Sequence, residues 1–179
     1  MVSENKILPQ LDNTQSIVVV CKGRDYAKLM IGCYKEISKD FKKICLVALN
    51  KPFHDLIKDF QKEGLDCSNY YFVDCLSAKD TRLKESEQCL YVSSPSALTE
   101  LALAIEKIRK TYQIDLMILD NISSLLIYNE EVTTLRFLHS TMTKLRQTNT
   151  KSVYCILQKD MKGPMEDLSL FADAVIELS

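Results

Sequence analysis

Short apolar runs alternate along this chain with longer stretches in which apolar side chains recur every three or four residues. An unbroken apolar run is typical of a strand buried on both faces, and the longer period is typical of an amphipathic helix. The runs predict strands at residues 16–21, 43–49, 70–75, 89–92, 116–119, 152–157 and 174–178. The longer stretches predict helices at about 26–38, 52–64, 95–112, 130–147 and 165–172.

Turn-forming and polar residues mark several element boundaries. Gly64 suits the end of its helix, where a left-handed residue is often needed. Ser94 and Pro95 are expected to cap and begin the helix that follows them. The charged stretch 77–88 lacks apolar periodicity and predicts an exposed loop, and the apolar stretch 122–128 predicts a short turn before the long helix.

Strand and helix alternate from one end of the chain to the other. This order is typical of an α/β fold with a mostly parallel sheet and helices on both of its faces. The chain has 179 residues, with no internal repeat and no linker, so we expect one domain, residues 1–179.

The charge balance narrows the possible partners. Lysine and arginine together number 23 against 24 acidic residues, so no strong field favours nucleic acid or an anionic membrane. The polar start lacks the apolar segment of a signal peptide, and no stretch reaches the length of a membrane span. We expect a cytoplasmic protein that binds neither membranes nor nucleic acid.

The seven cysteines show no C-x-x-C spacing, and most of them lie in apolar strand or helix contexts. A cysteine in such a context acts as a small hydrophobe, so we expect reduced, buried thiols rather than a zinc site or a disulfide framework. Cys67 lies in the polar run Asp66–Asn69 and is the expected exception.

Asp120 directly follows the apolar run 116–119, which places it at the carboxyl end of a central strand. In open α/β sheets the ligand crevice lies just outside these strand ends, where a carboxylate can hold Mg²⁺ beside phosphates. Four apolar residues followed by Asp form the Walker B pattern. A strand-end carboxylate also accepts hydrogen bonds from the backbone amides of the next turn, here Asn121–Ser123, so a metal-binding role and a capping role both stay open.

The order of these elements resembles a RecA-type ATPase domain of the P-loop NTPase class, in its KaiC-like branch, from about residue 14 to 179. Four stretches carry the resemblance: ICLVALNKPFHDLIKDFQKEGLD with YYFVDCLS, LTELALAIEKIRKTY with LMILDNISSLL, RFLHSTMTKLRQTNTKSVYCIL, and LSLFADAVIEL. The resemblance implies a three-layer RecA-like fold, ATP and Mg²⁺ as the family's ligands, and Asp120 as the counterpart of the Walker B aspartate.

The phosphate loop of that family is altered here. Such a loop needs glycines whose backbone N–H groups surround the phosphates, a lysine for the β and γ oxygens, and a hydroxyl for Mg²⁺. The corresponding stretch is CKGRDYAKL. In one alignment with the motif, Tyr26 and Ala27 replace the last glycine and the lysine, and Lys28 takes the hydroxyl position. If the alignment shifts by one residue, Lys28 takes the lysine position, but Ala27 and Leu29 replace the neighbouring motif residues. Lys28 is therefore either a vestigial nucleotide ligand or a solvated helix residue.

Two further parts of the hydrolytic apparatus differ. The family has a pair of glutamates after the second strand, one of which activates the attacking water, whereas this chain has Asn50 and Lys51, and neither is a general base at neutral pH. His54 follows one helical turn later, but a lone histidine in an amphipathic helix is usually a packing or surface residue. KaiC-like domains also continue into a hairpin with basic residues, whereas the sequence ends at Ser179.

These departures predict a degenerate ATPase homologue, a pseudo-ATPase with no catalytic residues and no bound metal or nucleotide. We expect a non-catalytic interaction or regulatory and signalling module whose partner is another protein or a second copy of the chain. The alternative is a weak nucleotide binder or residual ATPase that uses Lys28 and Asp120 with ATP and Mg²⁺. A receiver domain phosphorylated on Asp120 fits poorly, because the strands are too many and no acidic pair follows the first one.

Overall fold

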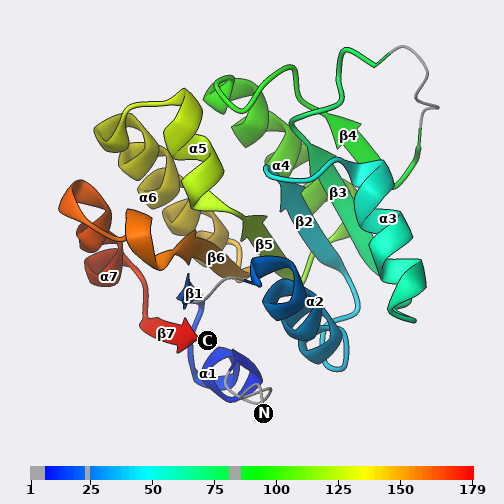
Figure 1. Ribbon diagram of the computed structural model, residues 1–179, viewed down its shortest axis with the longest axis horizontal. Helices are drawn as coiled ribbons and strands as arrows, with labels where there is room; N and C mark the ends of the chain where they lie inside the picture. Colours follow the sequence, from blue (N-terminus) through cyan, green and yellow to red (C-terminus); the bar gives the residue numbers. More distant parts are fainter. Residues whose placement is uncertain (1–6, 23–24, 81–85) are drawn as a thin grey trace.

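The computed structural model describes residues 7–22, 25–80 and 86–179, which form a seven-stranded sheet with helices on both faces (Figure 1). The strand order is β4-β3-β2-β5-β6-β1-β7, and all six neighbouring pairs are parallel. The strands are β1 (Ser16–Cys21), β2 (Ile44–Ala48), β3 (Tyr70–Asp74), β4 (Cys89–Tyr91), β5 (Leu116–Asp120), β6 (Lys151–Leu157) and β7 (Ala174–Leu178). The helices are α1 (Ile7–Asn13), α2 (Tyr26–Ile37), α3 (Phe53–Lys62), α4 (Leu98–Tyr112), α5 (Ile122–Tyr128), α6 (Glu131–Gln147) and α7 (Leu168–Phe171), with 3-10 turns η1 (Gln158–Asp160) and η2 (Gly163–Asp167).

Alternate residues of each strand belong to two separate hydrophobic cores, because successive side chains of a strand point to opposite faces. On one face α1, α2 and α3 cover side chains such as Ile17 and Leu46. On the other face α4, α5, α6 and α7 cover side chains such as Val18 and Val47. The result is a three-layer α/β fold, which confirms the predicted fold class.

The predicted strands are confirmed with small shifts at their ends. Strands 16–21 and 174–178 begin and end where the apolar runs place them, and β6 begins at Lys151, one residue early. The predicted end of α3 is also confirmed, since Gly64 follows the helix with a φ of 65°, a conformation that glycine adopts without strain.

One helix begins later than predicted, and one predicted turn is a helix. The helix expected from Pro95 begins at Leu98, because the residues before it form a turn in which the Ala97 N–H donates to the Ser94 carbonyl at 3.0 Å. The stretch 122–128, expected to be a turn, is the helix α5. The side chains of Ile122 and Leu125 pack into the second core, which stabilises a helix too short to be stable by itself.

The helix α1 was not predicted, because its seven residues give too little apolar periodicity. Its buried side chains are Ile7 and Leu11, which pack into the first core. The ammonium group of Lys151 donates hydrogen bonds to the carbonyls of Leu11 and Thr14, and so holds the end of α1 against the start of β6. Tertiary contacts rather than local sequence form this helix.

The predicted loop 77–88 is described only in part. Residues 77–80 and 86–88 lie in turns and bends, with a single bridge between Ser86 and Cys89. Residues 81–85 lie outside the described part of the chain.

Six of the seven cysteines are buried, and Cys67 is partly exposed, as the sequence predicts. Burial raises the pKa of Cys21, Cys45, Cys75 and Cys89 to about 12. These thiols therefore stay protonated at neutral pH and are weak nucleophiles.

We expect a thiol reagent to label Cys67 quickly in the native protein and the buried thiols only after unfolding. The measurement is the rate of labelling with a chromogenic disulfide before and after addition of denaturant. The variant Cys67→Ser should lose the fast phase, and fast labelling of most of the thiols in the native protein would contradict the expectation.

Candidate functional site

Asp120 ends β5 at the carboxyl edge of the sheet, between β2 and β6. This confirms the strand-end position that the sequence predicts. Asp120 is only 4% exposed, and both oxygens of its carboxylate accept hydrogen bonds from tyrosine hydroxyls. Tyr26 donates to Oδ1 and Tyr34 donates to Oδ2. A longer contact of 3.4 Å joins Nδ2 of Asn50 to Oδ1.

Both tyrosines come from α2. They are eight residues apart, a little over two helical turns, so they lie on the same side of the helix. Asp25 is the N-cap of α2, where its carboxylate accepts the Lys28 N–H at 3.2 Å. Leu29 and the other buried side chains of the helix pack against the sheet and hold the two hydroxyls over Asp120.

The charges of this cluster depend on one another. Burial raises the pKa of Asp120, and the hydrogen bonds from Tyr26 and Tyr34 oppose that rise. Burial and the charge of Asp120 raise the pKa of both tyrosines, so both hydroxyls stay protonated and can donate. The tyrosines supply the hydrogen bonds that water would give to an exposed carboxylate.

The turn after β5 is capped by Asn121 and not by Asp120, so the capping alternative for Asp120 was wrong. The Oδ1 atom of Asn121 accepts the Ser124 N–H at 2.9 Å and the Ser124 hydroxyl at 3.2 Å. An asparagine at the N-cap satisfies a backbone donor of the first turn and so begins α5. The Asp120 carboxylate is therefore available to accept hydrogen bonds from the two tyrosines of α2.

A second buried carboxylate, Asp74, ends β3 and was not singled out from the sequence. It accepts three backbone N–H groups, from Phe53 at 2.8 Å, Leu76 at 2.7 Å and Ser77 at 3.1 Å. The bond from Phe53 joins the start of α3 to the end of β3, and the other two hold the turn that follows β3. The available signal was YYFVD, an apolar run that ends in Asp as LMILD does.

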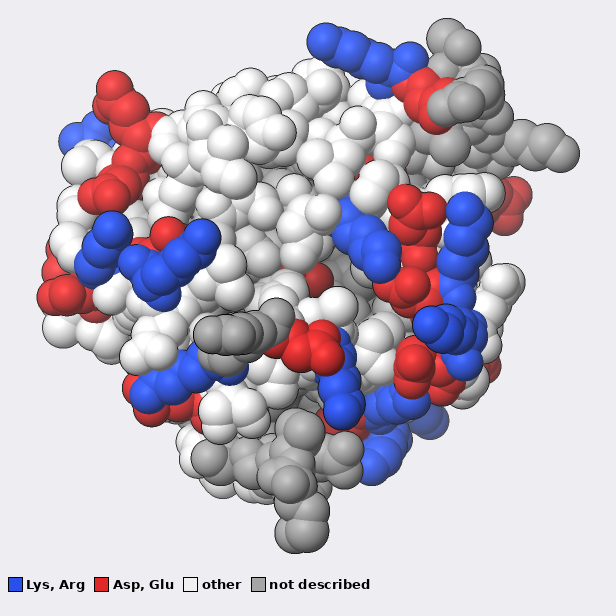
Figure 2. Space-filling model, in the orientation of Figure 1, with Lys and Arg blue, Asp and Glu red and all other residues white. Residues whose placement is uncertain are grey.

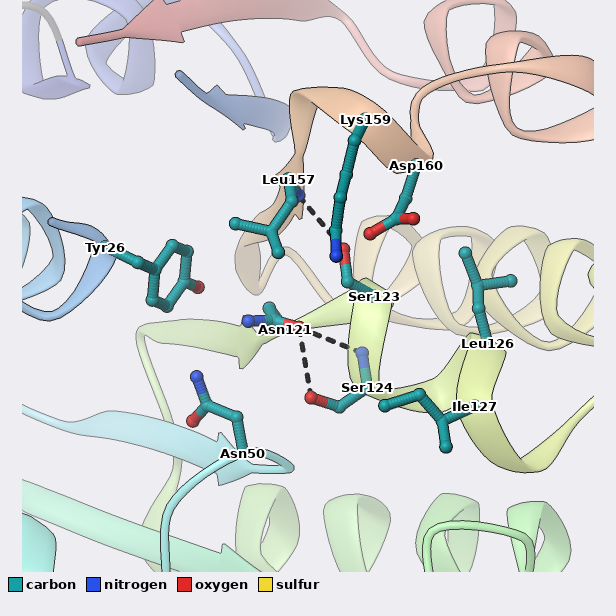
Figure 3. A pocket seen from close by; sticks show the side chains of 10 residues that line it. All are labelled: Tyr26, Asn50, Asn121, Ser123, Ser124, Leu126, Ile127, Leu157, Lys159 and Asp160. Carbon is teal, nitrogen blue, oxygen red and sulfur yellow. Dashed lines mark hydrogen bonds between the residues drawn. The ribbon is translucent and has the colours of Figure 1, made fainter. Parts of the chain in front are cut away.

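A depression of about 400 Å³ opens beside the Asp120 cluster (Figure 3). It is lined by Tyr26, Asn50, Asn121, Ser123, Ser124, Leu126, Ile127, Leu157, Lys159 and Asp160. Asp120 does not line it, whereas Tyr26, whose hydroxyl binds Asp120, does. Figure 3 shows the amide side chains of Asn50 and Asn121 directed toward the ring of Tyr26. The tyrosine therefore stands between the open space and the carboxylate.

Lys28 lies at a different place. It is exposed on α2 and lines a separate depression between α2 and α3, where Lys51 forms an ion pair with Asp59. His54 is exposed at the start of α3. The structure does not bring Lys28 and Asp120 into one pocket.

The described residues include neither a cluster of metal ligands nor a membrane-spanning helix. Within residues 7–22, 25–80 and 86–179, no three His, Cys, Asp or Glu side chains are grouped as a metal site. No helix in the same ranges is long and apolar enough to cross a membrane.

No protein-family model matches the chain, and no curated protein matches it in sequence. Its fold matches the crystal structure of a KaiC-like protein, PH0186, from the hyperthermophilic archaeon Pyrococcus horikoshii OT3. The TM-score is 0.66 and the identity is 15%, over 93% of this chain and 73% of that chain. At this identity the likeness concerns the fold alone. The chain therefore has a KaiC-like fold of the RecA type.

Proposed function

We propose that this chain is a degenerate relative of the KaiC-like ATPases, a pseudo-ATPase that acts as a non-catalytic interaction or regulatory module. The observation that carries this proposal is the pairing of Asp120 with Tyr26 and Tyr34. The sequence resemblance assigns to Asp120 the role of the Walker B aspartate, which holds Mg²⁺ beside the phosphates. In this chain both oxygens of that carboxylate already accept hydrogen bonds from the two tyrosine hydroxyls.

The residues around Asp120 do not fit a Mg²⁺ ion. Magnesium takes oxygen ligands at about 2.0–2.1 Å in octahedral geometry and keeps several waters. A site of that kind needs a carboxylate that faces open solvent, but Asp120 is 4% exposed and lies behind Tyr26. A metal would have to displace the tyrosine hydroxyl and leave it without a buried acceptor, which is unfavourable.

The phosphate side of the site supports the same proposal. Tyr26 and Ala27 stand at the start of α2, where one register of the family motif has glycine and lysine, and Tyr26 turns its side chain toward β5. In the other register Lys28 is the lysine, but its side chain lies in the depression between α2 and α3. Asn50, where the family has a glutamate, donates a hydrogen bond to Asp120 and does not act as a general base toward water.

The partner in this proposal is another protein or a second copy of the chain, in the cytoplasm. The 23 basic and 24 acidic side chains balance, which favours neither nucleic acid nor an anionic membrane.

We expect millimolar Mg-ATP or Mg-ADP to raise the melting temperature by less than about a degree, with no hydrolysis above a buffer control. A nucleotide present at about a hundred times its dissociation constant would add about 2.7 kcal/mol, or roughly 5–10 °C for a domain of this size. Differential scanning fluorimetry and phosphate release measure the two quantities.

The second candidate is a weak nucleotide binder or residual ATPase, for which the depression of about 400 Å³ beside Tyr26 offers space, although neither Lys28 nor Asp120 lines it. A rise of several degrees that both Lys28→Ala and Asp120→Asn abolish would establish it and overturn the pseudo-ATPase. The variant Lys107→Ala, at an exposed position on α4, is the matched control and should behave as the wild type.

A further inference from the structure

The side-chain amide of Asn121 keeps one donor without a partner. Its Oδ1 atom accepts the N–H and the hydroxyl of Ser124. Its Nδ2 atom donates to no acceptor among the described residues, although Asn121 is only 4% exposed. This atom faces the depression of about 400 Å³ that Asn121 lines (Figure 3). A nearly buried donor without an acceptor is unfavourable, so the amide favours a ligand that accepts its hydrogen bond.

Two opposite charges line the same depression. They belong to the consecutive residues Lys159 and Asp160, in the 3-10 turn that follows β6. Among the described residues neither of them forms an ion pair, with the other or with a third residue. Figure 3 shows both charged groups directed toward Ser123, in the first turn of α5. The depression therefore offers one ammonium group and one carboxylate to a ligand, and its lining has no net charge.

The side of the depression that α5 forms is apolar. Leu126 and Ile127 line it, on the side away from Tyr26 (Figure 3). Residues 121–129 include no charged side chain. Figure 2 shows a broad uncharged area in the upper middle of the molecule, over α4 and α5. Ile127 is 76% exposed, so an apolar group placed against it would remove apolar surface from water.

We infer that this depression binds a free α-amino acid with an apolar side chain. The carboxylate of the amino acid accepts hydrogen bonds from Nζ of Lys159 and Nδ2 of Asn121, and its ammonium group donates to the carboxylate of Asp160. Its side chain packs against Leu126 and Ile127. Opposite charges on consecutive residues match a ligand whose own two charged groups are joined through one carbon atom, as they are in an α-amino acid.

Other classes of ligand match this lining less well. A nucleotide carries several negative charges, which one lysine beside one aspartate does not neutralise. A simple carboxylate would bring its negative charge beside the unpaired Asp160, and a simple amine would bring its positive charge beside the unpaired Lys159. The volume of about 400 Å³ is near the lower end of the range for small-molecule sites, which suits a ligand of amino-acid size.

The first test is calorimetric titration of the full chain, without nucleotide, with L-leucine, L-methionine and L-phenylalanine. We expect at least one of them to bind saturably at one site per chain, with a dissociation constant below about 1 mM. For L-leucine the matched comparison ligands are isocaproate, which lacks the ammonium group, and isoamylamine, which lacks the carboxylate. Each should bind more than about fivefold more weakly than L-leucine, because each leaves one charge of the depression unpaired.

The second test removes the two charges of the depression one at a time. Lys159→Gln and Asp160→Asn should each raise the dissociation constant of the amino acid more than about fivefold. Neither residue is buried, so both variants should keep the melting temperature of the wild type within about a degree. The matched controls are Lys107→Gln on α4 and Asp167→Asn at the end of η2, which are exposed and lie outside the depression, and they should bind as the wild type does.

Three results would overturn the inference. They are no saturable binding of any of the amino acids up to about 10 mM, binding of isocaproate or isoamylamine as tight as that of L-leucine, and a dissociation constant that either Lys159→Gln or Asp160→Asn leaves unchanged. Amino-acid binding goes beyond the proposed function and is measured without nucleotide, so its failure leaves the pseudo-ATPase intact. Nucleotide binding would overturn the pseudo-ATPase and is measured in a separate titration.

Discussion

The variant with Tyr26→Phe and Tyr34→Phe should be less stable than the wild type by about 3–5 kcal/mol at neutral pH, because it leaves the buried Asp120 carboxylate without its two hydroxyl donors. The loss is large because the charge stays buried while its compensation is removed. Only the contact of 3.4 Å from Asn50 is left. Denaturant unfolding with an unchanged m value measures this difference.

The loss of stability should depend on pH in a defined direction. Burial already raises the pKa of Asp120 in the folded protein, and removal of the hydroxyl donors raises it further. A carboxyl group whose folded pKa is above its unfolded value adds stability at low pH, and this contribution is lost as the pH rises through the folded pKa. The double variant should therefore recover part of its stability as the pH is lowered from 7 toward about 4.

Two controls isolate the carboxylate. Tyr128→Phe removes a hydroxyl that is exposed and should change the stability by less than about 0.5 kcal/mol. Asp120→Asn in the background of both phenylalanine changes removes the buried charge and should restore part of the loss and flatten the pH dependence. A double variant that is as stable as the wild type at all pH values would show that the tyrosines do not compensate Asp120.

Asp74→Ala should cost about 2–4 kcal/mol, because three backbone N–H groups lose their acceptor at a fully buried position. The loss also frees the start of α3 from the end of β3. Asp74→Asn keeps one acceptor oxygen and should cost less. Urea unfolding measures both variants, and Asp40→Ala at an exposed position is the control. Equal stabilities of Asp74→Ala and Asp40→Ala would contradict the capping role of Asp74.

The strands could be predicted from the sequence because a parallel sheet buried on both faces requires unbroken apolar runs. The run LMILD thus placed Asp120 at a strand end, and β5 ends there. Helix starts were harder to predict. Ser94 and Pro95 have the residue types of a helix start but form a turn, and Asn121 caps a helix where the sequence predicts a turn.

The contacts of Asp120 could not be read from the sequence. The sequence shows Tyr26 only as a bulky residue at a position where the family loop has glycine. Its bond to Asp120 joins residues 94 positions apart, and the bond from Tyr34 joins residues 86 positions apart. Only the packing of α2 over the sheet brings these groups together, and local sequence patterns do not predict a contact between residues so far apart.

Isothermal titration calorimetry of the full chain with Mg-ATP, at nucleotide concentrations up to about 5 mM, tests the central claim most directly, since even a dissociation constant near 1 mM corresponds to about 4 kcal/mol of binding free energy. If the hydroxyls of Tyr26 and Tyr34 stay hydrogen-bonded to the Asp120 carboxylate, as they are in the structure, the titration heats should equal the heats of dilution. Saturable binding at one site per chain, lost in Asp120→Asn, would show that Asp120 holds a magnesium–nucleotide complex and would contradict the claim.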